Sequence, residues 1–258
     1  MIAPTLGAQV LHLSSWRAIF GVLVVLGAGT LAGLVTLMPE TLPPARRDRR
    51  DIGTIQETYL ALARHRRFVS YALTGAFTSV GLFAYVAGSS FAFIDHYEQS
   101  PQVFAGIFAM NSLGIISANL VNARLVSRLG SDRLLRIGAG AAAASSLLVL
   151  ASTVGDQGAP ALAASLLLFA TSSGLIMANA ISGGMAASPG GVGAASAVLG
   201  CMQYGDGFVG STLLGVSTNG ALLPLGIVVL TGGIGAGIAV RWGVRATAPP
   251  SGVETSQI

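Results

Sequence analysis

The sequence predicts an all-α, polytopic helical membrane protein with about seven complete spans and one partial span. Six long stretches contain no Asp, Glu, Lys, Arg or His, and they cover residues 18–39, 68–94, 99–123, 137–155, 157–205 and 207–240. A bilayer core about 30 Å thick needs about 20 predominantly apolar residues in a spanning helix. Only 9% of the residues are charged and the mean hydropathy is +0.72, whereas a soluble domain has about 25% charged residues.

Taken in order, the spans are predicted at residues 17–38, 68–94, 102–123, 134–154, 160–186, 193–216 and 222–240. The longest uncharged stretch exceeds one span, and it is divided at Ser188-Pro189-Gly190-Gly191 because Pro and Gly interrupt helices. Residues 1–13 are apolar but too short to cross a bilayer, and they lack the basic start and cleavage site of a signal peptide. They are predicted to be the second half of a helix whose first half is missing.

The arginines predict the orientation of these spans. All 14 Lys and Arg residues are Arg, and every one except Arg17 lies in 40–67, in 124–136 or after residue 240. The alternate connections, 95–101, 155–159 and 217–221, contain no Arg. Because Arg beside spans stays preferentially on the cytoplasmic side, the Arg-rich segments and the C-terminus are predicted to be cytoplasmic.

Several other classes of protein are disfavoured. The net charge of +4 comes from Arg beside spans rather than from a basic and aromatic patch, so no nucleic-acid partner is expected. The single Cys201 lies in an apolar span, which argues against disulfides and a metal-ligand cluster. No P-loop, HExxH, dinucleotide fingerprint or Ser-His-Asp arrangement is present, so no cofactor or metal is expected.

Short motifs give the chain a family resemblance. Ala3-Pro4-Thr5-Leu6-Gly7-Ala8 resembles the Gly-Pro-x-x-Gly-Gly antiporter motif of major facilitator drug:proton antiporters, with Pro4 and Gly7 matching and Ala replacing the first and last Gly. Further segments with the expected order and spacing are Ser15-Trp16-Arg17-Ala18-Ile19-Phe20, Pro39-Glu40-Thr41-Leu42, Phe104-x-x-x-Phe108-Ala109-x-Asn111, Asn122-Ala123-Arg124-Leu125 and Ala195-Ser196-Ala197-Val198-Leu199-Gly200. Up to about residue 242, the chain is similar to the Bcr/CflA multidrug-resistance subfamily.

The resemblance implies a partial major facilitator fold running from the end of span five to span twelve. Residues 1–38 would end the first helical bundle, with part of span five and span six. Residues 39–67 would form the basic cytoplasmic loop between bundles, 68–242 the second six-helix bundle, and 243–258 a disordered cytoplasmic tail. The implied function is proton-coupled efflux of drugs or small lipophilic metabolites across a bacterial plasma (inner) membrane. The implied partners are the small-molecule substrate, the proton, the lipid bilayer and the missing N-terminal spans.

A second motif lies at the cytoplasmic end of the span at 102–123. Ala123-Arg124-Leu125-Val126-Ser127-Arg128-Leu129-Gly130 resembles the facilitators' Gly-x-Leu-Ala-Asp-Arg-x-Gly-Arg motif, with Arg128 and Gly130 matching and Ser127 in the place of the acid. The resemblance implies a charged clasp between cytoplasmic helix ends. The alternative is that these Arg only fix the topology.

Asp206 is the only acid in the middle of a predicted span. A carboxylate at that depth is costly and usually faces a cavity or a partner, so Asp206 is a candidate for proton coupling. The alternative is a buried acid bonded to Gln203, Tyr204 or a main-chain carbonyl.

Six other residues are candidates for contact with a cargo. Phe77 and Tyr85 would form an aromatic wall, and polar groups would come from Asn111, Asn179, Gln203 and Tyr204. The alternative is structural, because polar groups in spans often link helices.

Two competing functions are weighed against transport. An intramembrane enzyme would need several catalytic polar groups at one depth, whereas only one mid-span acid is present. A truncated, non-transporting membrane fragment or subunit is the second alternative.

Overall fold

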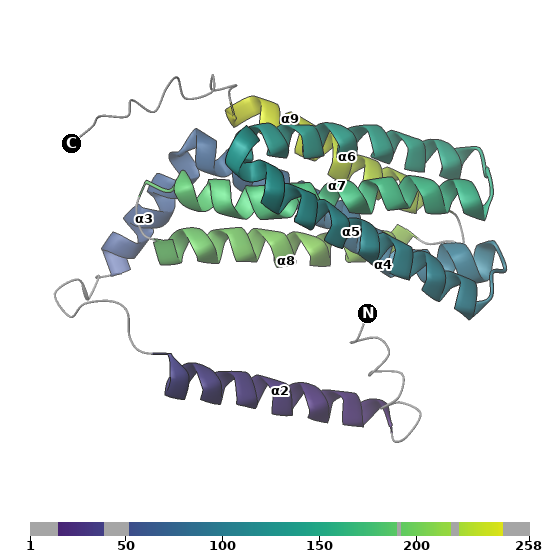
Figure 1. The fold of residues 1–258 in the computed structure, drawn as a ribbon, viewed down its shortest axis with the longest axis horizontal. Helices are drawn as coiled ribbons and strands as arrows, with labels where there is room; N and C mark the ends of the chain where they lie inside the picture. Colours follow the sequence, from purple (N-terminus) through teal and green to yellow (C-terminus); the bar gives the residue numbers. More distant parts are fainter. Residues whose placement is uncertain (1–14, 39–51, 190–191, 218–221, 245–258) are drawn as a thin grey trace. The chain divides into compact units, whose positions relative to one another are not determined.

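The computed structural model describes residues 15–38, 52–189, 192–217 and 222–244, and these residues are helical except for short connections (Figure 1). The all-α prediction is therefore confirmed for the described residues. The chain divides into two compact units, 1–54 and 55–258. The motif residues Pro4 and Gly7 and positions 245–258 of the tail predicted at 243–258 lie outside the described residues.

The first unit contains α2, Trp16–Leu37, and the second contains the remaining long helices. Helix α3 (Ile52–Arg64) crosses the boundary between the units, and α4 (Arg66–Ser90) continues as the π-helix η2 (Phe91–His96). The rest of the second unit consists of α5 (Pro101–Leu129), α6 (Ser131–Val154), α7 (Ala159–Ala186), α8 (Val192–Ser217) and α9 (Leu223–Gly243).

Six of the seven predicted spans are both long and apolar enough to cross a membrane. The exception is α8, whose 26 residues suffice in length but whose hydropathy is lowered by Gln203, Tyr204 and Asp206. The predicted break is confirmed, since α7 ends before Ser188-Pro189-Gly190-Gly191 and α8 begins after it.

An additional helix and a longer helix distinguish the structure from the sequence-based expectation. The segment treated as a basic loop contains α3, whose Ile55, Tyr59 and Leu62 follow the spacing of an amphipathic helix. Helix α5 continues to Leu129, beyond the predicted end at residue 123, because neither Gly nor Pro occurs between that residue and Gly130.

Helix α4 occupies the centre of the second unit, in contact with α7, α8 and α9, while α7 also contacts α5 and α6. Glycines permit this close approach: a Cβ at Gly210 of α8 would meet the main chain of Val80 in α4. Likewise, a Cβ at Gly233 of α9 would meet Ser146 of α6, so the glycine pair Gly233 and Gly237 packs as small residues do between membrane helices. The core thereby holds the helices at fixed positions around α4.

Candidate functional site

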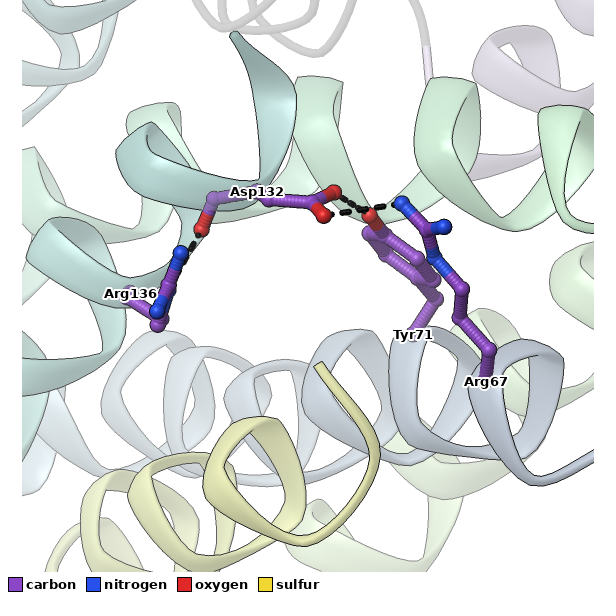
Figure 2. A network of polar contacts seen from close by, with 4 residues as sticks. All are labelled: Arg67, Tyr71, Asp132 and Arg136. Carbon is purple, nitrogen blue, oxygen red and sulfur yellow. Dashed lines mark hydrogen bonds and ion pairs between the residues drawn. The ribbon is translucent and has the colours of Figure 1, made fainter. Parts of the chain in front are cut away.

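A polar cluster joins α4 to α6 at the end of the second unit where both helices begin (Figure 2). The carboxylate of Asp132 accepts hydrogen bonds from the hydroxyl of Tyr71, at Oδ1, and from Nη2 of Arg67, at Oδ2 and 2.8 Å. Arg67 is half exposed, whereas Asp132 is largely covered and Tyr71 is buried. These three residues are called the clasp below.

Local structure places each member of the clasp. Gly130, at φ 75°, forms the connection between α5 and α6 in a conformation that favours glycine, and α6 begins at the next residue. Asp132 therefore lies in the first turn of α6, where the helix dipole stabilises a negative charge. Arg67 and Tyr71 are four residues apart on α4 and so share one face.

Helix α7 completes the surroundings of the clasp. A Cβ at Gly183 would overlap the ring of Tyr71, so only glycine leaves room for that ring. A cavity of about 280 Å³ opens beside the clasp, and its lining consists of Arg67, Tyr71, Ser131, Asp132, Ser182, Gly183, Ala186 and Ala187. The clasp thus lies where α4, α6 and α7 meet, beside space that the described residues do not fill.

The acid that pairs with an arginine lies just after the second motif, in the first turn of α6. Arg128 is exposed and has no ion pair with the described residues, and Ser127 is exposed as well. The acid that binds an arginine is Asp132, five residues after Ser127, and its partner is Arg67 of α4. One signal was available in the sequence, because Asp132 is the only acid between Asn111 and Val154.

Two of the predicted cargo residues are brought together between α4 and α5. Nδ2 of Asn111 donates a hydrogen bond to the hydroxyl of Tyr85 at 2.6 Å. The Tyr85 ring stacks on Phe108 with the ring centroids 5.9 Å apart. Asn111 is 2% exposed, and its Oδ1 has no hydrogen-bond partner among the described residues. A buried acceptor without a partner among the described residues therefore lies next to an aromatic pair.

Asn179 lies elsewhere, between α7 and α5. Its Nδ2 donates to Oδ1 of Asn122 at 2.5 Å and to the carbonyl oxygen of Leu175 at 2.7 Å. Asn179 is 1% exposed and Asn122 is 7% exposed. This contact links two helices, as the structural alternative for polar residues in spans describes.

The other candidates are dispersed. Phe77 packs its ring where a Cβ at Gly235 of α9 would lie, so it fills a gap between α4 and α9. Gln203 borders a small depression between α4, α7 and α8, whereas Tyr204 is 69% exposed. Asp206 is partly buried and has no hydrogen bond or ion pair with another described residue. The described residues therefore contain no hydrogen bond from the Asp206 side chain to Gln203, to Tyr204 or to a main-chain carbonyl, which the structural alternative requires.

The opposite end of the second unit carries a different polar contact. Nε2 of His96 lies 3.4 Å from Oδ1 of Asp156, so η2 meets the turn between α6 and α7. Tyr97 packs edge-on against the His96 ring, with the centroids 4.8 Å apart. Burial raises the pKa of the Tyr97 phenol to about 12, and Asp156 acts in the same direction. This end is thus joined by a polar contact between η2 and the turn that follows α6.

Comparison with known proteins decides the family. A family model described as the Major Facilitator Superfamily matches residues 1–211. The chain belongs to the Major Facilitator Superfamily. It is 33% identical over 231 residues to the MFS-type transporter YdgK of Bacillus subtilis, covering 89% of this chain and 57% of that protein.

Other relatives carry names that refer to resistance. The bicyclomycin resistance protein homolog of Haemophilus influenzae is 25% identical over 83% of this chain and 54% of its own length. The multidrug transporter MdfA of Yersinia pestis is 30% identical over 60% of this chain and 37% of its own length. This chain, a multi-pass membrane protein of a transporter family, spans about half the length of the first two relatives.

Proposed function

We propose that the chain provides the second helical bundle of a secondary transporter, with the span that precedes it, and that the transporter exports drugs or small lipophilic metabolites in exchange for protons. The observation that carries the proposal is the similarity to named transporters along most of the chain. The proposed membrane is the bacterial plasma membrane, with the Arg-rich segments and the C-terminus in the cytoplasm. Alternating access would rock one bundle against the other around a site at mid-membrane depth.

The polar surface of α8 supports this function. The side chains of Gln203, Tyr204 and Asp206 form no hydrogen bond with the described residues, and Tyr204 is mostly exposed. A carboxylate facing hydrocarbon is costly, so such groups normally border water or a polar partner. We infer that α8 borders an aqueous pathway and that Asp206 exchanges protons there.

The Tyr85 and Asn111 pair is the proposed cargo contact on α4 and α5. The unpartnered Oδ1 of Asn111 would accept a hydrogen bond from a cargo, and the stacked rings of Tyr85 and Phe108 would contact its apolar part. The clasp has a separate proposed role at the cytoplasmic end of the bundle. It would close this end when Arg67 and Asp132 are paired.

The test uses the full-length transporter that contains this chain, in a host without its own efflux pumps. Resistance to bicyclomycin and efflux of a lipophilic dye driven by an imposed pH gradient are the two readouts. The expected result is export by the wild type, and loss of the proton-driven part in Asp206→Asn with normal protein level in the membrane. Asp95→Asn, which removes an exposed acid outside mid-span, is the matched control and should export normally.

Three results would contradict the proposal at different points. Absence of any export by the wild type would exclude the transport function. Normal proton-driven efflux in Asp206→Asn would exclude only the proton-coupling role. A reporter fused after Arg50 should signal the cytoplasm and one after Gln99 the outside, and the reverse pair would exclude the proposed orientation.

A further inference from the structure

A basic and aromatic pocket lies where α3 ends, α4 begins and α9 ends. Its volume is about 390 Å³, and its lining consists of Arg64, His65, Arg66, Arg67, Trp242 and Gly243. This volume falls in the range of about 300–1,000 Å³ that is typical of small-molecule sites. The pocket is separate from the Tyr85 and Asn111 pair and from the polar residues of α8.

Contacts between α4 and α9 hold the pocket in shape. Ser70 donates a buried hydrogen bond to the carbonyl oxygen of Ala239 at 2.6 Å. A Cβ at Gly243 would collide with the main chain of Arg66, which shows how closely the two helix ends approach. Arg66 is fixed on this frame, because its Nη2 donates to the carbonyl oxygen of Trp242 and its guanidinium lies 5.0 Å from the centre of the Trp242 ring.

The charges in the pocket are not balanced. No carboxylate is among its lining residues, and the acid that reaches one of its arginines is Asp132, which pairs with Arg67 from the clasp side. The acid of α3 is Glu57, about two turns before Arg64. Arg64 has no hydrogen bond or ion pair with the described residues, and it extends the basic surface at the end of α3.

The residues that line the pocket favour an anionic ligand at a membrane surface. Guanidinium groups bind phosphate oxygens in a planar, two-bond geometry. Trp is enriched at the interface between hydrocarbon and water, and Trp242 is 48% exposed at the end of a spanning helix. Basic groups beside spans are the sequence feature associated with anionic lipids of the cytoplasmic leaflet.

We propose that this pocket binds the phosphate headgroup of an anionic phospholipid, with Arg64 and Arg66 contacting the phosphate and Trp242 contacting the region just below it. Arg66 is held ready by its ring contact, so binding requires little further ordering of that side chain. The lipid would join the ends of α3, α4 and α9. This proposal concerns lipid binding and stands independently of transport.

The test is native mass spectrometry of the purified 258-residue chain in detergent, titrated with phosphatidylglycerol or with phosphatidylethanolamine of identical acyl chains. The expected result is at least tenfold tighter binding of phosphatidylglycerol. Arg64→Gln plus Arg66→Gln should weaken it about 30-fold, which is about 2 kcal/mol. Arg64→Gln alone should weaken it about fivefold, and it removes no hydrogen bond or ion pair among the described residues.

The matched control is Arg124→Gln plus Arg133→Gln, which removes the same charge from exposed sites on α5 and α6. Its binding should stay within threefold of the wild type. Equal weakening in the control, or equal binding of the two lipids, would overturn the proposal by showing a general charge effect. Displacement of the lipid by millimolar inorganic phosphate would overturn it in favour of a soluble phosphate ligand.

Discussion

Asp132→Asn tests the clasp most directly, because it removes one negative charge and leaves the size of the side chain unchanged. Hydrogen bonds to charged groups contribute about 1.5–3 kcal/mol, whereas an exposed ion pair contributes about 0.2–1 kcal/mol. Tyr71 is buried and Arg67 is half exposed, so the two bonds fall in different classes. Asn retains one acceptor oxygen. We expect the free energy of unfolding to fall by about 1–2 kcal/mol.

The measurement is unfolding of the purified chain by SDS in mixed micelles, followed by circular dichroism. Tyr71→Phe and the double variant complete a mutant cycle, and the coupling between Tyr71 and Asp132 should be about 1 kcal/mol. Asp95→Asn is the charge-matched control and should stay within about 0.5 kcal/mol of the wild type. A coupling energy near zero, or an equal loss in the control, would refute the reasoning that the clasp joins α4 to α6.

Three further outcomes follow from described contacts. Gly183→Ala should lower the free energy of unfolding by about 1–3 kcal/mol, because the added methyl group displaces the Tyr71 ring. The control is Gly140→Ala, which should not lower it, since nothing lies within 4 Å of that position. Equal losses in the two variants would contradict the packing argument. Asn179→Ala should lower the free energy of unfolding by about 0.6–1.7 kcal/mol, because it leaves Asn122 without its donor. Adding Asn122→Ala to this variant should lower it little further. Additive losses would show that the two side chains do not stabilise the protein as a pair. Since the pKa of Tyr97 is raised from 10.0 to about 12, the stability that it contributes should be complete below pH 10 and lost as the pH rises toward 12. In Tyr97→Phe, this loss of stability between about pH 10 and 12 should be absent. If the free energy of unfolding of Tyr97→Phe depended on pH as that of the wild type does, the role of burial at Tyr97 would be contradicted.

The spans were predictable from sequence because bilayer thickness sets the length of an uncharged helix, independently of which helix it packs against. Helix α3 was missed because its apolar residues alternate with polar ones beside an Arg-rich stretch, so hydropathy alone does not reveal it. The acid of the clasp was missed for a different reason. Asp132 meets Tyr71 and Arg67 from more than 60 residues away in the chain, and the motif has its acid at position 127, where this sequence has Ser127.

The candidate site shows the same difference between local and tertiary information. Tyr85 and Asn111 were each predicted from residue type, yet only packing reveals that they bond to each other. Asn179 was predicted on equal grounds, but its hydrogen bond to Asn122 makes it a link between helices. Residue type therefore identifies polar groups in spans, and the partner of each group indicates its role.

Partnering also separates α8 from the other helices. The polar side chains of α4, α5 and α7 discussed above largely satisfy one another: Tyr85 bonds to Asn111, and Asn122 bonds to Asn179. By contrast, the side chains of Gln203, Tyr204 and Asp206 form no hydrogen bond with the described residues. Unsatisfied polar groups are expensive in hydrocarbon, so α8 needs water or a polar partner along this surface. A helix that serves only to pack a bundle has no such need, whereas a helix that borders a transport pathway does.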